Sequence, residues 1–443
     1  MVIAAEGIPN NLTAEELYVK SNDVIIGLKS HKVNVVSYSC DGTEVERSVQ
    51  NLLVARATNW VTYSIRDPKN DYRHEIQMPS YRLAPIVMIQ DSKHALKTLR
   101  NNLFSGARAL VLGNHPAMYS HVWDMAFSNL PGCPLYHRDV EKLDRQDDNA
   151  ATRLFSAAAL NFVIVQFPDR LGLIVYLFIM GELVDAYQSR TISHFEQIKM
   201  VLRCRYFLRL WRHFLGAAGY TESRYYISRE ADDILNTMIN GLIGLVYIYR
   251  DHLGDHRYPL LPWLHSTETC KHVFAECRKL VKDFTHLNFL HMIPRLHILI
   301  QAASLFSKGT DPKAQAMGYS HSYLDPEDAN TESLASFPTD GEIVLAVDEA
   351  WDEAVALLGL LGIQLDDLPK TPATHPADPL PPPLDNDMEE ESPSKEAEAT
   401  TLQCMISVQQ GAGWERNDTR TKNEMHMMTC ATITLEIEER RRL

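Results

Sequence analysis

The sequence has none of the short motifs by which several common enzyme classes are identified. It contains no GxxxxGK[ST] phosphate loop, no GxGxxG turn, no CxxC pair and no GxSxG nucleophile elbow. A nucleotide hydrolase of the phosphate-loop type, a dinucleotide-binding oxidoreductase, a dithiol redox protein and an α/β-hydrolase are therefore poor interpretations.

Cysteines and long apolar runs are also scarce. The seven cysteines are odd in number and scattered, which is typical of a reducing compartment rather than of a disulfide framework. The longest apolar run, residues 171–180, is too short to span a bilayer, so we expect a buried helix there. No secretory signal begins the sequence, and we expect a nuclear or cytoplasmic protein that is not secreted and has no membrane partner.

Positive charge is in deficit, with 43 basic against 57 acidic residues and a formal net charge of −14. From Thr371 onward acidic residues outnumber basic ones two to one, so about half of the excess lies in that stretch. A DNA-binding domain usually carries an overall basic charge. Any DNA contact by this chain must come from a local basic surface.

What the sequence does contain is a strand–Asp–helix pattern that occurs twice. A capping box at Thr13–Glu16 predicts a first helix to about residue 30. Residues 33–39 predict a strand that ends at Asp41-Gly42, followed by a helix over 44–56. Residues 85–90 predict a second strand that ends at Asp91, followed by a helix through residue 103.

Most of the remaining chain is expected to be helical. The predicted helices span residues 149–165, 171–188, 193–215, 228–250, 267–284, 288–305 and 340–361. Beyond residue 368 the composition turns to proline and acidic residues, which cannot bury enough apolar surface to order the chain. We therefore expect a disordered linker and tail over 369–443.

Asp41 and Asp91 are candidate metal ligands. Carboxylates just past the ends of neighbouring parallel strands lie at the sheet edge where ligands bind. Two of them can hold Mg²⁺, which prefers oxygen ligands, and Mg²⁺ can clamp a phosphodiester during its cleavage. Asp41 suits a turn or cap equally well, and for Asp91 the helix N-cap interpretation is favoured because Asp-Ser-Lys-His is a good helix start.

Two basic stretches are candidate DNA-binding surfaces. The first contains Lys93, His94, Lys97 and Arg100, of which the lysines and arginine share a helical ridge, with Arg108 beyond it. The second lies in the predicted 193–215 helix and includes Arg203, Arg209 and Arg212 among aromatic residues. A solvated face for the first and an amphipathic packing helix for the second are the competing interpretations.

Histidines and cysteines between residues 252 and 277 do not make a convincing zinc site. They are His252, His256, His265, Cys270, His272 and Cys277. Their spacings match no standard structural zinc site, so other roles are favoured.

Three segments resemble transposases of the P-element type. Residues 35–50 (VVSYSCDGTEVERSVQ) look like a signature of that group, and residues 91–103 (DSKHALKTLRNNL) are similar to its D-x-x-H-x-x-K-x-x-R-N-x-L segment. Residues 258–268 (YPLLPWLHSTE) look like its C-terminal segment. The resemblance spans roughly residues 10–330.

The resemblance implies a metal-dependent DNA-cleaving fold. The expected class is α/β plus α: a partial RNase H-like core over 1–115, a helical insertion domain over 116–262, C-terminal helices completing the core over 263–368, and the tail. Implied with it are Mg²⁺, DNA as partner, a possible homo-oligomer, and Asp41 as the second of three catalytic acids. GTP binding, known in the family, is not transferred because no phosphate loop is present.

The chain departs from the family at two catalytic positions. The first acid of the family lies on an earlier strand, and we expect this chain to begin after that strand and without the amino-terminal DNA-binding domain. At the terminal acid the sequence has Lys271 in place of glutamate, and Glu268, one helical turn away, is the remaining catalytic candidate. A lysine beside Asp41 competes with a metal ion for its charge.

These observations leave three hypotheses. The first is a transposase-derived protein, ancestrally a metal-dependent DNA strand-cleaving and strand-transfer enzyme, whose catalytic set has degenerated. The second is a non-catalytic DNA- or protein-binding helical module. The third is a transposon remnant without function.

Overall fold

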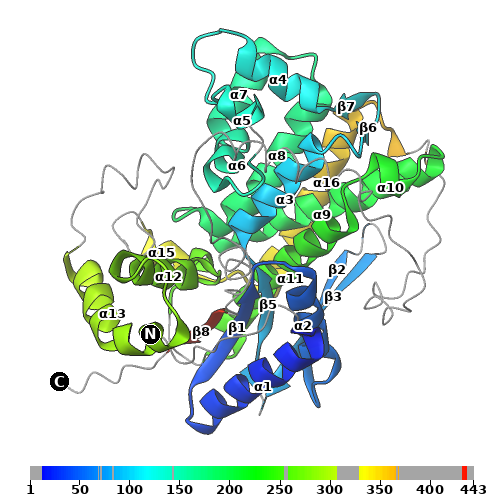
Figure 1. The fold of residues 1–443 in the computed structure, drawn as a ribbon. Helices are drawn as coiled ribbons and strands as arrows, with labels where there is room; N and C mark the ends of the chain where they lie inside the picture. The colour runs from blue at the N-terminus through cyan, green and yellow to red at the C-terminus, as the bar shows by residue number, and fades with distance from the viewer. Residues whose placement is uncertain are drawn as a thin grey trace, which may run out of the picture. The chain divides into compact units, whose positions relative to one another are not determined.

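The computed structural model describes residues 12–365 except 68, 70–71, 82–83, 142–143, 254–257 and 307–328, and also residues 368 and 432–436. The helices and strands named below all belong to one compact unit of the chain. The fold is mostly helical, with small parallel and antiparallel sheets (Figure 1).

The sheet that carries the site is built from distant parts of the chain. β1 (Asn34–Cys40) pairs in parallel with β5 (Val87–Gln90), so that Cys40 lies opposite Gln90. β8 (Thr432–Glu436) pairs antiparallel with the other side of β1. The parallel pair confirms that the two predicted strand–Asp–helix units lie side by side in one sheet.

Helices cover both faces of this sheet. α1 (Ala14–Ser30) and α2 (Glu44–Ala55) lie against β1, and an apolar cluster separate from the main core fills the space between them (Figure 1). Both helices begin with a Thr-x-x-Glu capping box, as predicted for α1. α11 (Arg229–Asp251) packs against β5 and β1.

Glycines allow α11 to approach β5 closely. A Cβ added at Gly241 would lie 2.7 Å from the Ile89 side chain, and one added at Gly244 would lie 2.7 Å from that of Val87. Because real Cβ atoms do not come that near, these glycines set the helix–strand distance.

The structure also contains an antiparallel hairpin that was not predicted. In the sequence it lies between the two strand–Asp–helix segments. β2 (Trp60–Asp67) pairs antiparallel with β3 (Tyr72–Tyr81), which also pairs with the short β4 (Ala84–Pro85). A second small sheet joins β6 (Leu110–Leu112) and β7 (His115–Ala117).

The central region is helical, as expected. Its elements are α3 (Ser92–Phe104), α4 (Tyr119–Phe127), α5 (Arg138–Glu141), α6 (Asp148–Leu154), α7 (Ala157–Gln166), α8 (Leu171–Gln188), α9 (His194–Ala217), α10 (Glu222–Tyr225) and α11. The single helix predicted over 149–165 is wrong. Ser156 ends that run by capping the new helix α7 with its hydroxyl, which accepts from Ala159 N–H.

α8 is the described helix that is long and apolar enough to cross a membrane by length and composition alone. In the structure, 67% of its 18 residues are buried inside the protein. Leu173, Tyr176 and Leu183 are fully buried in the main core. The prediction of a buried helix is confirmed.

The C-terminal segments separate into two groups. η1 (Pro262–Leu264), α12 (Glu268–Leu280) and α13 (His286–Phe306) follow the central region, and α12 and α13 share a small apolar cluster of their own. α15 (Thr331–Leu334) precedes α16 (Asp340–Leu360), which packs along α9 and joins the main core. α16 therefore packs mainly on the helical region and also contacts β2.

The segment predicted to be a disordered tail is structured in one place. β8 is part of residues 369–443, and its pairing with β1 corrects the prediction for those five residues. The other residues of that segment lie outside the described part of the chain.

Candidate functional site at the strand ends

The carboxylates of Asp41 and Asp91 lie at the same edge of the sheet. Cys40 is in register with Gln90 on the neighbouring parallel strand, and the Asp91 N–H donates to the Cys40 carbonyl at 3.0 Å. Each aspartate is the first residue past its strand. This is the arrangement that the sequence predicted.

Asp91 is completely buried and its carboxylate is saturated with hydrogen bonds. Oδ1 accepts from the backbone N–H groups of Lys93 (2.9 Å) and His94 (3.1 Å), which makes Asp91 the N-cap of α3. Oδ2 accepts from the Thr267 hydroxyl at 2.5 Å and from its N–H at 3.2 Å. The N-cap interpretation is confirmed.

The electrostatics of Asp91 are set by a neighbouring cation, the partly exposed Lys271. Burial by itself would raise the pKa of this carboxyl, but the ammonium of Lys271, the Thr267 hydroxyl and the backbone N–H of His94 outweigh it and hold the pKa well below its usual range. Asp91 is therefore ionised at neutral pH.

Lys271 lies among three carboxylates. Its Nζ is 2.9 Å from Asp41 Oδ1, 3.3 Å from Asp91 Oδ2 and 3.2 Å from Glu268 Oε1. Burial opposes its charge, but Asp91, Asp41 and Glu268 together raise the pKa of Lys271 well above the ordinary lysine value. Lys271 is therefore a firmly charged ammonium.

Glu268 points into the same cluster and is 2% exposed. Its Oε1 faces Lys271, and its Oε2 accepts from Lys93 Nζ at 3.0 Å. Both oxygens of Glu268, the remaining candidate for a catalytic acid, are therefore engaged by lysine ammonium groups.

Asp41 is the accessible member, with a side chain that is 29% exposed. Its Oδ1 lies 3.1 Å from the Thr267 hydroxyl and contacts Lys271, while Oδ2 lies 3.7 Å from His94 Nδ1. Burial lowers the pKa of His94, so this histidine is neutral at pH 7. Since the hydroxyl has one proton and lies nearer to Asp91, Lys271 is the main partner of Asp41.

Gly42 fixes the turn after Asp41. Its φ is +88°, and a Cβ there would lie 2.9 Å from Gln90 Oε1. The Gln90 amide donates to Gln50 Oε1 at 2.6 Å, and the Gln50 amide donates to the carbonyls of Tyr38 and Ile89. This buried amide pair ties the ends of both strands together.

Glu46, in the first turn of α2, is a further buried acid close to Asp41. It is 2% exposed, and Oε2 accepts from the Thr43 N–H and hydroxyl while Oε1 is buried without a hydrogen-bond partner. Burial and the nearby Asp41 raise the pKa of Glu46 to about 7.

These donor groups do not fit Mg²⁺. A magnesium ion needs carboxylate oxygens that are free to coordinate it in an octahedron. Here the inward-facing oxygens of Asp41, Asp91 and Glu268 all contact the Lys271 ammonium. Over the described residues, no group of three His, Cys, Asp or Glu side chains has an arrangement that could hold a metal ion.

The basic side chains of α3 that were predicted to bind DNA contact other groups within the protein. Lys93 pairs with Glu268, and Lys97, only 7% exposed, pairs with Asp148 at 3.1 Å. Arg100 is 2% exposed, and its guanidinium donates to the backbone carbonyls of Asp139 and Asp144. Arg100 as a DNA contact is therefore wrong, because its charge serves to hold the 139–144 segment.

The second basic stretch is also paired. Arg203 is 7% exposed and forms ion pairs with Glu182 of α8 and Glu353 of α16, which corrects its prediction as a DNA contact. Arg212 is exposed and pairs with Glu222 at 2.8 Å and Asp232 at 3.2 Å. Arg209 is half-buried on α9. The packing interpretation of this helix is the better one.

Two histidines of the zinc pattern, His252 and His265, have other partners. His265 is 2% exposed, its Nδ1 lies 2.8 Å from Ser37 Oγ and its Nε2 lies 3.2 Å from the Tyr249 hydroxyl. Burial lowers the pKa of His265 to about 3, so it is neutral and joins β1 to α11. His252 contacts the Tyr63 hydroxyl, and His256 lies outside the described residues.

Thr267 was missed by the sequence analysis although it bridges both aspartates. The signal that could have identified it is its place directly before α12, in the Ser-Thr-Glu triplet that begins this helix. That position predicts a cap, but the side chain contacts Asp91 and Asp41 instead.

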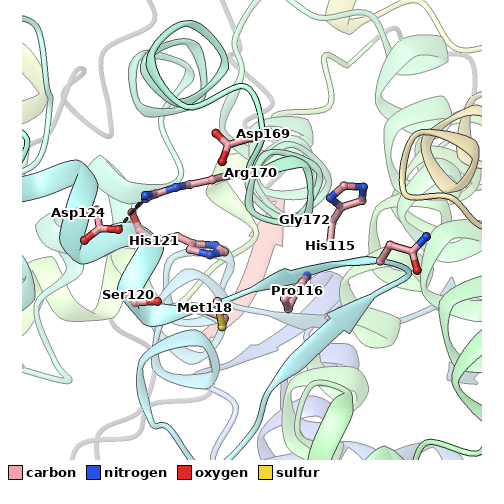
Figure 2. A pocket seen from close by; sticks show the side chains of 10 residues that line it. His115, Pro116, Met118, Ser120, His121, Asp124, Asp169, Arg170 and Gly172 are labelled. Atoms are coloured by element: carbon pink, nitrogen blue, oxygen red, sulfur yellow. Dashed lines mark hydrogen bonds and ion pairs between the residues drawn. The ribbon is translucent and has the colours of Figure 1, made fainter.

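A cavity of about 510 Å³ lies elsewhere, between β7, α4 and the start of α8 (Figure 2). Arg170 borders it and is held by the Asp124 carboxylate at 2.7 Å and the His121 carbonyl at 2.7 Å. None of the strand-end carboxylates lines this cavity.

Comparison with known proteins gives one distant likeness. No family model matches the chain, and no curated protein matches it. Among solved structures, the "Drosophila P element transposase strand transfer complex" resembles it with 13% sequence identity and a TM-score of 0.47. The likeness covers 65% of this chain and 64% of that chain, so this chain spans less than two thirds of that protein's length.

Proposed function

We propose that this chain is a transposase-derived protein whose strand-end carboxylates no longer support metal-dependent DNA cleavage. The supporting observation is the Lys271 ammonium, which lies within 3.3 Å of Asp41, Asp91 and Glu268. The motifs that resemble the family carry the two aspartates to neighbouring strand ends, and the lysine at the terminal-glutamate position removes the free oxygens that Mg²⁺ needs.

A nicking assay tests this proposal. Supercoiled plasmid is incubated with the full chain and Mg²⁺ or Mn²⁺, beside an Asp41→Ala variant. We expect no nicking above background from either protein. Nicking by the native chain that Asp41→Ala abolishes contradicts the proposal, whereas equal nicking by both proteins identifies a contaminating nuclease.

DNA contact without cleavage is a second candidate function. A groove of about 390 Å³ beside α3 is lined by His94, Lys97, Arg108 and Arg145, among others. Lys97 is already paired and Glu230 lines the same groove. Arg108 Nη1 donates to the carbonyls of Glu222 and Tyr226, so Arg145 and the remaining N–H groups of Arg108 are the principal sites for backbone phosphates.

Salt-dependent DNA binding, followed by fluorescence anisotropy, tests this second function. Replacement of both Arg108 and Arg145 by alanine is expected to lower the slope of log K against log salt by about 1 to 2. Joint replacement of Arg295 and Lys282 by alanine, both at exposed sites, serves as the charge-matched control. A slope that falls no more in the double variant than in the control rules the groove out.

A further inference from the structure

One side of α13 packs within the protein and the other side faces solvent. The packed side joins α12 through a small apolar cluster that includes Phe289, Met292 and Leu296. On the other side, Leu287 and Ile298 are both 64% exposed. A helix with apolar residues all round is normally buried all round. The outward side of α13 is therefore a candidate interaction surface.

The exposed apolar side chains line up along the helix. Four residues recur at every third or fourth position and therefore lie along one side of α13: Leu287, Leu290, Pro294 and Ile298. Leu290 is 47% exposed, and Pro294 is exposed as well. We call these four residues the α13 ridge. Their spacing is that of a seam through which two helices pack.

The charge around the α13 ridge is positive, although the whole chain has a net charge of −14. α13 contains no Asp or Glu, and the exposed Arg295 is its one Lys or Arg. The last turn of α12 adds Arg278, and the loop between the two helices adds Lys282 and Asp283, whose charges offset one another. A partner that complements this surface is apolar on one side and acidic at its edges.

The size of the α13 ridge limits what can cover it. At about 1.5 Å per residue it runs about 17 Å from Leu287 to Ile298, and it is no wider than one helix. This surface is well below the roughly 800 Å² per partner of a stable interface. A dimer through α13 would also bring together two basic helices with no acid on either. The size and the charge therefore fit one helix of a different protein, bound transiently.

We propose that the α13 ridge is a docking site for an acidic amphipathic helix of a partner protein. The apolar side of that helix packs on Leu287, Leu290 and Ile298, and carboxylates at its edge pair with Arg295. Nucleic acid complements the surface less well, because phosphates neutralise an arginine but do not cover exposed leucine side chains.

Fluorescence anisotropy of a labelled helical peptide with the full chain tests the proposal. The peptide is about 14 residues long, or two heptads, with leucine at positions a and d and glutamate elsewhere. We expect saturable binding that joint Leu287→Ser and Leu290→Ser weakens at least about tenfold, because two apolar contacts are lost. Arg295→Glu should weaken binding by about threefold, as expected for an exposed ion pair.

Joint Leu345→Ser and Leu360→Ser is the matched control. These leucines lie on α16 and are 50% and 58% exposed, so the same chemistry is removed from a different helix. The affinity for the peptide should not change. All the replaced leucines are exposed, so both double variants should unfold at the temperature of the native chain. A peptide of the same composition, scrambled so that its leucines share no face, should not bind.

Four results would overturn the proposal. The first is no binding of the peptide to the native chain, and the second is equal weakening by the α13 and α16 double variants. The third is a native dimer in sedimentation that the α13 double variant converts to monomer, because a second copy then covers the ridge. The fourth is displacement of the bound peptide by duplex DNA, which would make the surface a polyanion site.

These results leave the proposed function untouched, because they involve neither nicking nor the strand-end carboxylates.

Discussion

Asp91 combines two roles at a single residue, the cap of α3 and the buried partner of Lys271 and Thr267. We predict that Asp91→Ala lowers the free energy of unfolding by about 2–4 kcal/mol, because it removes the cap and leaves the buried N–H and hydroxyl of Thr267 without their acceptor. Urea denaturation followed by circular dichroism measures this loss.

Asp147→Ala is the control for the capping role. Asp147 caps α6 by accepting from Ala150 N–H at 3.0 Å, and its loss is expected to cost about 1 kcal/mol. If both substitutions cost the same, Asp91 acts as a cap alone and its link to Lys271 contributes nothing.

Glu46 predicts a pH dependence of stability. Because its pKa in the folded protein is raised from 4.5 to about 7, the folded state holds a proton that the unfolded state releases between these values. Its favourable contribution is complete below pH 4.5 and is lost as the pH rises through 7. Glu46→Gln keeps the capping oxygen and should remove a decline of on the order of 3 kcal/mol between pH 4.5 and 8.

The capping boxes of α1 and α16 are expected to show the opposite pH dependence of stability. Glu16 and Glu342 make the same contacts with Thr13 and Thr339 but are exposed, and the hydrogen bonds from these threonines lower the pKa of each glutamate. Glutamine at these positions should remove stability that is present above pH 4.5 and lost in acid. Matching pH profiles for Glu46→Gln and Glu16→Gln, from urea titrations at several pH values, would contradict the role of burial.

The structural role of a residue could be predicted from the sequence where its partners lie nearby in the chain. Asp91 could be identified as a helix cap because its partners, Lys93 and His94, follow it directly. Thr267 could not, because the aspartates that it contacts lie 176 and 226 residues away. The resemblance to the P-element-type motifs identified Lys271 and Asp41 as residues of interest. The contacts of the Lys271 ammonium with Asp91 and Glu268 depend on the fold.

At the scale of elements, the close packing of α11 on β5 depends on its glycines. We predict that Gly241→Ala destabilises the protein by about 1–3 kcal/mol, because the new methyl group would lie 2.7 Å from Ile89 and 3.0 Å from the Met88 carbonyl. Gly27→Ala in α1 meets nothing within 4 Å and should instead stabilise by about 0.5–1 kcal/mol. Chemical denaturation of both variants checks the sign, and a gain for Gly241→Ala would show that α11 can shift away.

Elements with strong boundary residues were the ones predicted correctly. α1, α2 and α16 each begin with a capping box. α8 has no side-chain cap and was predicted instead from its apolar sequence. The β2–β3 hairpin was missed although Val61, Tyr63 and Ile65 alternate with polar residues in β2, a pattern typical of a half-buried strand. The break between α6 and α7 was missed because the apolar pattern continues across Ser156.

At the scale of the whole molecule, charge pairing between distant segments decides which basic surfaces are free. Arg203 was predicted as a DNA contact from a basic helix face, but its partner Glu353 lies 150 residues further on. No local pattern can indicate such a pair. The net charge of −14 fits a fold whose arginines on α9 serve internal contacts.

The last prediction concerns α16, which returns from a distant part of the chain to cover α9. A chain ending at residue 338 lacks α16 and exposes the surface that buries Ile343, Val347 and Leu358. Burial of these three side chains contributes about 5 kcal/mol or more, which is comparable with the net stability of a typical domain. We expect this shortened chain to lose cooperative thermal unfolding and to bind a hydrophobic dye.

A chain ending at residue 373 is the matched comparison. It keeps α16 together with the ion pairs that Lys199 and Arg203 form with it, and it loses the β8 strand at the edge of β1. We expect it to unfold cooperatively, at a temperature close to that of the full chain. If the chain ending at 338 unfolds at that same temperature, then α16 is an appendage and the core closes without it. If the chain ending at 373 fails as well, the edge of β1 needs β8, and the strand-end carboxylates depend on a segment that no sequence motif connects with them.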